Sequence, residues 1–300
     1  MGSRITTTEN RLRGGHRVVI KKGVGVSLAK EYQSIAYPRS QELADIPHEL
    51  SAEFETLEIY PLSDVHIGDP LLDEKRLYKF RDEILEQPNR YIICNGDLIN
   101  NATANSVSDH VEEVYRIDEQ IAIVAQFLDP VKDRILVMHE GNHEKRSYRY
   151  AEIWPTWEMA RQLRITPVYS RFPYILYLKF GKQRGKRTDR KAVYTLFGKH
   201  GTAGGRRPGA KLNNLQDMAG VVDADIYLQS HTHTPIAHRD SYIRLNTRNN
   251  KKIVIEKLYI NSGSFVNYGG YGSEHGYRPT STKYPKIVLH TKEKLAEAIL

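Results

Sequence analysis

One local pattern recurs along this 300-residue chain: a short apolar run followed at once by polar side chains. The clearest case starts at residues 135–138, Ile-Leu-Val-Met, and passes through Gly141 to Asn142, His143 and Glu144. An apolar run of this length predicts a buried strand, and the glycine that follows predicts a loop. A rigid strand can present the polar residues at its tip, which is where sheet proteins often place their chemistry. The chain is therefore expected to fold around a sheet.

Four other strand-like runs end in residues that carry oxygen or imidazole donors. The five tips together hold Asp64, His66, Asp97, Asn142, His143, His200, His231 and His233. In an open α/β sheet the carboxyl ends of neighbouring strands face one crevice, so we expect these residues to converge although they lie far apart in the sequence. Carboxylate, amide and imidazole ligands without thiolate suit Mn, Fe, Zn or Ni.

The remaining patterns predict a layered α/β fold. Strands are expected at residues 56–62, 91–94, 135–138, 174–180, 192–197, 226–228 and 253–260, and a last strand with a terminal helix at 284–300. Helical spacing of apolar residues predicts helices at 73–86, 109–128, 149–163 and 212–219. Alternating strands and helices in the first half imply a parallel sheet, whereas the second half is richer in hairpins. Two sheets packed face to face, with helices outside, satisfy both halves.

Residues 1–50 differ in composition from the rest of the chain. They carry many Arg, Lys and Gly residues and one short apolar patch at 18–20, so we expect a basic N-terminal arm before a single domain at 51–300. Cys94 is the only cysteine, which excludes an internal disulfide and a thiolate zinc site. No apolar run approaches the length of a membrane span, and the N-terminus lacks a secretory apolar region, so the interpretation is a cytoplasmic protein.

The order of these motifs resembles the calcineurin-like metallophosphoesterase superfamily. The chain has Asp-x-His at 64–66, Gly-Asp at 96–97, Gly-Asn-His-Glu at 141–144, a histidine at 200 and His-x-His at 231–233. The resemblance covers about residues 56–265 and implies a four-layer α/β/β/α sandwich of two mixed sheets. It also implies a ligand set of two divalent metals: one held by Asp64, His66 and His233, the other by Asn142, His200 and His231, with Asp97 as the bridge. Ser230 stands where relatives have a glycine, which is not a ligand.

Such a site implies two-metal hydrolysis of a phosphate ester. Two adjacent cations lower the pKa of a shared water, so that a bridging hydroxide can attack, and they neutralise the phosphate oxygens. A carboxylate with two oxygens suits the bridging position of Asp97. His143 follows Asn142 directly, so we expect it beside the substrate, where it can protonate the leaving oxygen or stabilise charge. Glu144 and Asn100 are expected to support the ligands.

The motifs favour a phosphodiesterase over a protein phosphatase. Phosphatases of the superfamily extend Gly-Asp into Asp-Arg-Gly, whose arginine holds the substrate phosphate, but here Leu-Ile-Asn-Asn-Ala follows Asp97. Residues 64–68 and 96–98 are similar to the Mre11/SbcD-type nuclease and phosphodiesterase branch, whose extra domains this chain is expected to lack. The alternatives are a phosphomonoesterase or protein phosphatase, and a non-catalytic scaffold. Loss of catalysis would leave gaps in the ligand set, and the sequence shows none.

An excess of basic residues favours an anionic partner. Lys and Arg number 44 and Asp and Glu 36, which gives a net charge of +8. Basic clusters at 182–191 and 204–211 suit DNA or RNA, and Tyr268, Tyr271 and Tyr277 can stack on bases. The alternative is a solvated hairpin tip and a loop that packs its own tyrosines. We therefore expect a manganese-dependent phosphoesterase that acts on phosphodiester bonds in nucleic acid or nucleotides.

Overall fold

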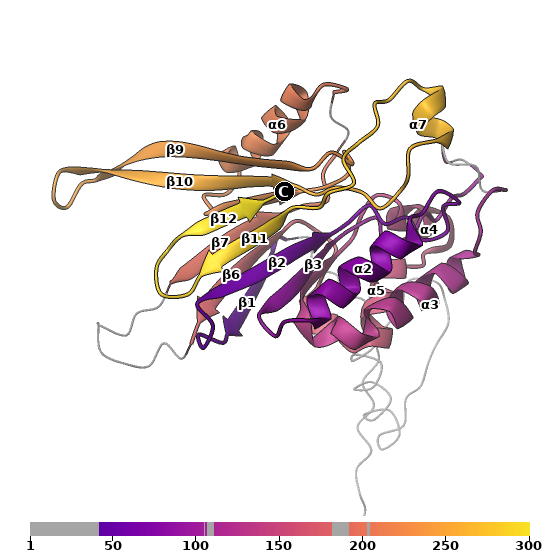
Figure 1. The fold of residues 1–300 in the computed structure, drawn as a ribbon, viewed down its shortest axis with the longest axis horizontal. Coiled ribbons are helices and arrows are strands. Elements are labelled where there is room, and N and C mark those ends of the chain that lie inside the picture. Colours follow the sequence, from indigo (N-terminus) through magenta and orange to yellow (C-terminus); the bar gives the residue numbers. More distant parts are fainter. Residues whose placement is uncertain (1–41, 105, 107–110, 182–191, 203–204) are drawn as a thin grey trace, which may run out of the picture. The chain divides into compact units, whose positions relative to one another are not determined.

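Two mixed sheets lie at the centre of the structure (Figure 1). The computed structural model describes residues 42–300 except for 105, 107–110, 182–191 and 203–204, and the unit it describes is Glu42–Leu300. The basic cluster at 182–191 and most of the predicted N-terminal arm lie outside the described residues. No described helix is long and apolar enough to cross a membrane.

The described strands form two sheets of six. The first has the order β1 (Ala44–Leu50), β6 (Tyr174–Phe180), β7 (Val193–Gly198), β8 (Ile226–Gln229), β10 (Lys251–Asn261) and β9 (Ile236–Asn246). The second has the order β12 (Ala296–Ile299), β11 (Lys286–His290), β2 (Thr56–Leu62), β3 (Arg90–Asn95), β4 (Ile135–His139) and β5 (Tyr169–Ser170). Strands β2 to β5 run parallel, whereas β6 and β7 pair as an antiparallel hairpin, and both findings confirm the predictions.

Aliphatic side chains of both sheets fill the space between them. Leu57 and Ile59 of β2 belong to the same buried cluster as Leu176 and Leu178 of β6. Strand β6 is buried at every second residue and half-buried between, as expected of a strand with one face on the core. The predicted face-to-face packing of two sheets is therefore confirmed.

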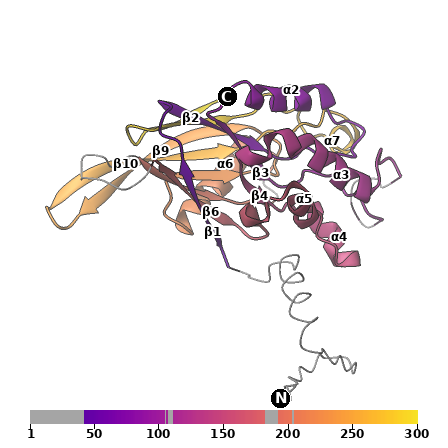
Figure 2. The same ribbon diagram turned by 90° about the horizontal axis from the view of Figure 1, so that it is seen from below.

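Helices cover the outer faces of both sheets (Figures 1 and 2). They are α2 (Glu74–Leu85), α3 (Ile117–Leu128), α4 (Glu144–Ala151), α5 (Pro155–Leu163), α6 (Pro208–Gln216) and α7 (Gly270–Glu274), with short 3-10 helices at Asp129–Arg134, Thr166–Val168 and Asp217–Gly220. Helix α2 buries Leu77, Phe80 and Ile84 and begins after Asp73, whose side chain accepts from the backbone N of Arg76, as predicted for its cap. Because α6 packs on the first sheet through Leu215, the layers are α/β/β/α.

The N-terminal boundary of the folded unit differs from the prediction. Residues 44–50, assigned to the arm, form β1 and pair in parallel with β6. Ile46 and Leu50 are its buried anchors. Pro47 indicated a boundary in the sequence, but β1 lies at the edge of its sheet, where a strand tolerates a residue without a backbone N–H.

Other elements also differ from the predictions. Residues of the single helix predicted at 149–163 are divided between α4, which ends at Ala151, and α5, which begins at Pro155. The helix predicted at 109–128 begins only at Ile117, and strand β9 had no counterpart in the prediction because most of its side chains are exposed. The predicted C-terminal helix is wrong: residues 296–299 form β12, antiparallel to β11. Ala-Glu-Ala-Ile has helical propensity, but four residues gain more from pairing with the open edge of β11 than from one helical turn.

Candidate metal centre

The ends of five strands bring the predicted ligands together. Asp64, His66 and His233 form one group, His66, Asp97 and His143 a second, and Asp97, His200 and His231 a third, and within each group the ligand atoms lie within 4.8 Å of one another. Asn142 joins the third group, because its Oδ1 lies 3.1 Å from His200 Nε2. Asp97 and His66 each belong to two groups, so all eight residues form one continuous cluster.

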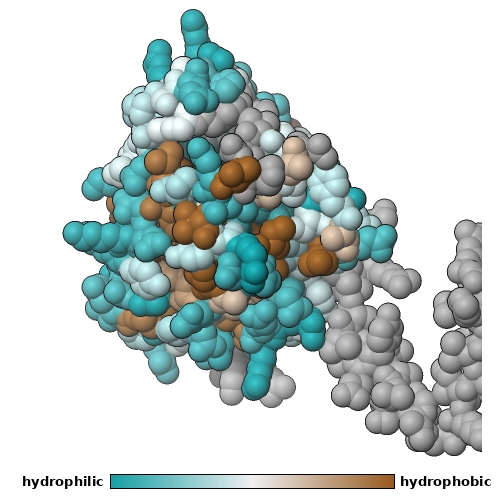
Figure 3. All heavy atoms as spheres, turned by 90° about the vertical axis from the view of Figure 1, so that its right-hand side faces the viewer, coloured by the Kyte–Doolittle hydropathy of each residue, from teal (hydrophilic) through white to brown (hydrophobic). Residues whose placement is uncertain are grey.

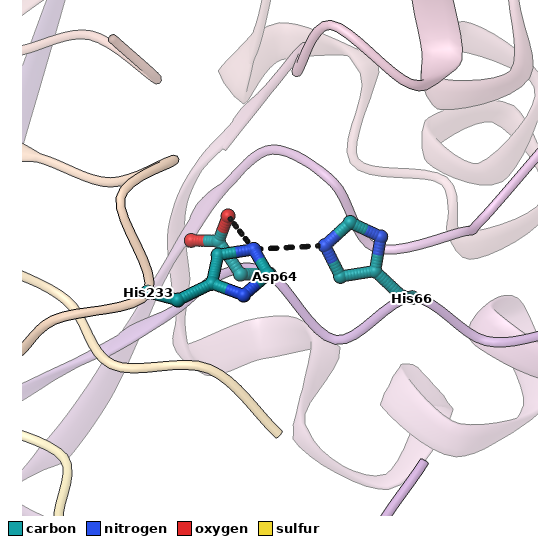
Figure 4. A group of neighbouring side chains, drawn as sticks. All are labelled: Asp64, His66 and His233. Carbon is teal, nitrogen blue, oxygen red and sulfur yellow. Dashed lines mark hydrogen bonds and ion pairs between the residues drawn. The ribbon is translucent and has the colours of Figure 1, made fainter. Parts of the chain in front are cut away.

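The first group places a carboxylate and two imidazoles side by side, with His233 between Asp64 and His66 (Figure 4). His233 Nε2 lies 3.2 Å from Asp64 Oδ1 and 3.3 Å from His66 Nε2. Asp64 is fully buried, and its Oδ1 has no hydrogen-bond partner of good geometry among the described residues. A buried carboxylate oxygen without a well-aligned donor is costly, and a cation among these three atoms would remove that cost.

The third group is centred on Asp97. Its Oδ1 accepts from the backbone N of His143 at 2.9 Å, and its Oδ2 lies 3.0 Å from His200 Nε2. His200 Nδ1 lies 2.7 Å from the carbonyl of Asn95, which only accepts, so this nitrogen carries a proton. In neutral His200 the Nε2 lone pair would then face two oxygens, those of Asp97 and Asn142. Lone pairs that converge in this way fit a bound cation.

Five of these residues have left-handed backbone conformations. The φ angles are 51° at Asp64, 55° at His66, 53° at Asp97, 70° at His231 and 55° at His233. Such a conformation in a residue other than glycine costs on the order of 1–3 kcal/mol and persists only where the surroundings impose it. The surroundings here are hydrogen bonds between loops, since the backbone N atoms of Val65 and His66 both donate to the carbonyl of Asp97. Strain gathered on candidate ligands indicates a functional site.

The charges of the cluster suit metal binding. Burial raises the pKa of the Asp97 carboxyl, but His200 and His143 outweigh burial and hold this pKa well below its usual range. Burial lowers the pKa of His66 to about 3. For His200, burial favours the neutral ring, but Asp97 outweighs it and raises the pKa to about 9. Ionised carboxylates and a neutral His66 are the forms that coordinate metals, whereas His200 would give up its Nε2 proton when a cation binds.

Glu144 holds the loops of the cluster from behind. Its Oε2 accepts from the backbone N of Asp97 at 3.1 Å and of Gly141 at 3.0 Å, and its Oε1 accepts from that of Leu98 at 2.7 Å. The side chain is buried, so these bonds tie the Gly-Asp loop to the start of α4. Asn100 contributes through its carbonyl, which lies 2.6 Å from His143 Nδ1.

Three residues around the site were missed in the sequence analysis. Asn95 Nδ2 donates to Ser230 Oγ at 2.6 Å, which gives the serine before His-x-His a structural role. Asn101 Nδ2 donates to the carbonyl of His143 at 2.6 Å, and Arg146 Nη2 lies 2.9 Å from His143 Nε2. Asn95 and Asn101 flank the Gly-Asp motif, and Arg146 lies one helical turn after His143, so nearness to a motif was the available signal.

We expect Gly141→Ala to damage the cluster without replacing any ligand. A Cβ at Gly141 would collide with Oδ1 and the backbone N of Asp97. Displacing this carboxylate should weaken Mn²⁺ binding by about 10- to 100-fold and destabilise the fold by about 1–3 kcal/mol. Calorimetric titration with Mn²⁺ and thermal unfolding measure both effects. Gly209→Ala is the matched control, because a Cβ there meets nothing within 4 Å; equal Mn²⁺ affinity in the two variants would contradict the expectation.

The four-layer fold and its cluster of carboxylates and imidazoles place the chain among candidate metal-dependent hydrolases. The calcineurin-like phosphoesterase family matches residues 59–235, more than half of the chain, and the chain belongs to this family. The predicted resemblance is therefore confirmed at the level of the family. No curated protein matches the chain.

Several solved structures are similar to this chain. One is a conserved protein described as a predicted phosphoesterase from Streptococcus pneumoniae TIGR4, with 15% identity, 82% of this chain and 98% of that chain covered, and a TM-score of 0.34. Vacuolar Protein Sorting 29 from Cryptosporidium parvum has 12% identity, 82% and 97% coverage, and a TM-score of 0.39. The calcineurin-like phosphoesterase YfkN from Bacillus subtilis has 11% identity, 81% and 90% coverage, and a TM-score of 0.37.

Proposed function

We propose that this protein hydrolyses phosphodiester bonds, in nucleic acid or nucleotides, with the help of two divalent cations, Mn²⁺ first among Mn, Fe, Zn and Ni. The observation that carries the proposal is the convergence of seven candidate ligands from five strand ends, five of the residues in the cluster having left-handed backbones. In this assignment Asp64, His66 and His233 hold one cation, Asn142, His200 and His231 hold the other, and Asp97 contacts both.

The protein's own groups then position the substrate and move a proton. When bound, the cations supply an activated water and neutralise phosphoryl charge. His143 is fixed at two points, by its backbone N on Asp97 Oδ1 and by its Nδ1 on the carbonyl of Asn100. Its Nε2 therefore faces the cluster, 3.8 Å from Asp97 Oδ2. From this place His143 Nε2 can take up the proton that the attacking water releases and pass it to the leaving oxygen.

A nucleic-acid or nucleotide substrate has support outside the cluster. The Arg206 guanidinium lies 5.3 Å from the ring centroid of Tyr277, and Tyr268 donates to the carbonyl of Tyr277 at 2.9 Å. Tyr268 and Tyr277 are 52% and 43% exposed, so part of each side chain is accessible to a base. The net charge of +8 favours a polyanion. The side chain of Tyr271 lies outside the described residues.

A hydrolysis screen with Mn²⁺ tests this proposal. We expect turnover of bis-aryl phosphate to exceed that of mono-aryl phosphate, and cleavage of at least one among cyclic nucleotides, single- and double-stranded DNA, and RNA. EDTA should abolish every activity, and elemental analysis should find two Mn per chain. A clear preference for the monoester would overturn the diester assignment. A protein without bound Mn would overturn the two-cation site.

A further inference from the structure

Arg146 is a half-buried cation beside the candidate metal centre, and its guanidinium forms no ion pair with a carboxylate of the described residues. Its Nη1 donates to the carbonyl of Asn100 at 3.1 Å, and its Nη2 lies 2.9 Å from His143 Nε2. Among the residues that the structure describes, no Asp or Glu forms an ion pair with its guanidinium, whereas Arg90 pairs with both Glu58 and Glu86. Burial lowers the pKa of Arg146, and the nearby charges of Asp97, Glu144 and Glu113 offset only part of this effect, so an anion in direct contact with the guanidinium would bind favourably.

The contact with Arg146 determines the resting state of His143. The carbonyl of Asn100, 2.6 Å from His143 Nδ1, only accepts, so Nδ1 carries the proton. Arg146 Nη2 only donates, so His143 Nε2 accepts from it. His143 Nε2 is therefore occupied by an arginine N–H and holds no proton of its own in this arrangement.

We propose that Arg146 forms an oxyanion subsite that binds a non-bridging oxygen of the substrate phosphoryl group, and that Arg146 releases His143 Nε2 as it does so. This inference rests on the proposed phosphoesterase function. The two nitrogens are 2.9 Å apart, so an oxygen that reaches His143 Nε2 is also within reach of Arg146. A guanidinium offers a planar fork of N–H donors that matches phosphate oxygens better than a point charge does.

The position of Arg146 on α4 makes the subsite specific. Arg146 lies three residues after His143 and one turn along the same helical face, whereas the adjacent Glu144 and Ser147 are buried against the loops. Arg149, on the same helix, is exposed and has no contact with the cluster among the described residues. Two arginines of one helix therefore differ in place and burial, which provides a matched pair for an experiment.

The test compares inorganic phosphate binding and ester hydrolysis in the full-length, Mn-loaded protein. Charge-assisted hydrogen bonds of this kind correspond to an affinity change of about 10- to 100-fold. We expect Arg146→Gln to weaken inorganic phosphate binding, measured by calorimetry, by that factor, and to raise the KM for bis-aryl phosphate while Mn content stays at the wild-type level. Arg146→Lys keeps the charge but loses the fork and should lie between. Arg149→Gln should stay within about twofold of wild type.

The possible results distinguish failure of the Arg146 subsite from failure of the proposed phosphoesterase function. If Arg146→Gln binds inorganic phosphate as tightly as wild type does, the subsite is overturned. The phosphoesterase assignment still stands in that case, provided that the wild-type protein binds Mn and hydrolyses an ester. Equal losses in Arg146→Gln and Arg149→Gln indicate general surface charge, and loss of Mn indicates an effect on the cluster; both overturn the subsite. A wild-type protein that neither binds Mn nor hydrolyses any ester overturns the proposed function itself. If Arg146→Gln does not fold, an unchanged phosphate affinity in Arg146→Lys overturns the subsite and a lowered one supports it.

Discussion

Asp97→Asn should lower metal-dependent hydrolysis by about 10³-fold or more and leave the fold intact. Asparagine has nearly the same shape as aspartate, so the acceptor for the backbone N of His143 can remain in place. The substitution removes the negative charge of the carboxylate that lies among His66, His143 and His200. Two cations at this point would then repel each other without a shared carboxylate between them.

Metal content and turnover, measured on the same sample, check this expectation. The variant should bind at most one Mn per chain by elemental analysis, and circular dichroism should match that of wild type. Asp82→Asn is the control, because Asp82 lies on α2, away from the cluster, and pairs only with its neighbour Arg81 among the described residues. Two bound Mn with wild-type turnover in Asp97→Asn would reject Asp97 as the bridge.

Much of the fold could be predicted from local patterns in the sequence. A buried strand needs a run of apolar residues, and residues 56–62, 91–94 and 135–138 show such runs where β2, β3 and β4 occur. Strands at the edges gave weaker signals, because β1 buries only two side chains and β9 exposes most of its own. Edge strands form because a neighbouring strand offers hydrogen bonds, and that neighbour is not visible in the strand's own sequence.

The candidate site was also predictable only in part from the local sequence. The candidate ligands lie directly at strand ends, so their convergence could be predicted from the rule that the carboxyl ends of parallel strands share an edge. Arg146 could not be predicted in this way, because basic residues such as those of Glu-Lys-Arg are also typical of a solvent-exposed helix face. Its contact with His143, and that of Asn95 with Ser230, depend on how two sheets and a helix pack. The convergence is now a structural finding, while the role of each ligand stays a prediction.

His143→Ala should keep both cations and lose about 10²- to 10⁴-fold in rate. The backbone N of residue 143 would still donate to Asp97 Oδ1, so alanine leaves the bridge in place while removing the ring. His238→Ala is the control, because His238 pairs with Asp240 on strand β9 and does not belong to the ligand groups. If His143→Ala loses Mn, His143 is itself a ligand, in keeping with its place beside His66 and Asp97.

A series of aryl and alkyl diesters then distinguishes proton donation from simple charge stabilisation by His143. A leaving oxygen of high pKa needs a proton as its bond to phosphorus breaks, whereas a nitrophenolate leaves without one. If His143 Nε2 delivers that proton, the rate lost in His143→Ala should grow steadily as the pKa of the leaving group rises. If the imidazole only stabilises phosphoryl charge, the loss should be the same across the series. A flat profile with intact Mn content would therefore reject His143 as the general acid and retain it as an electrostatic group.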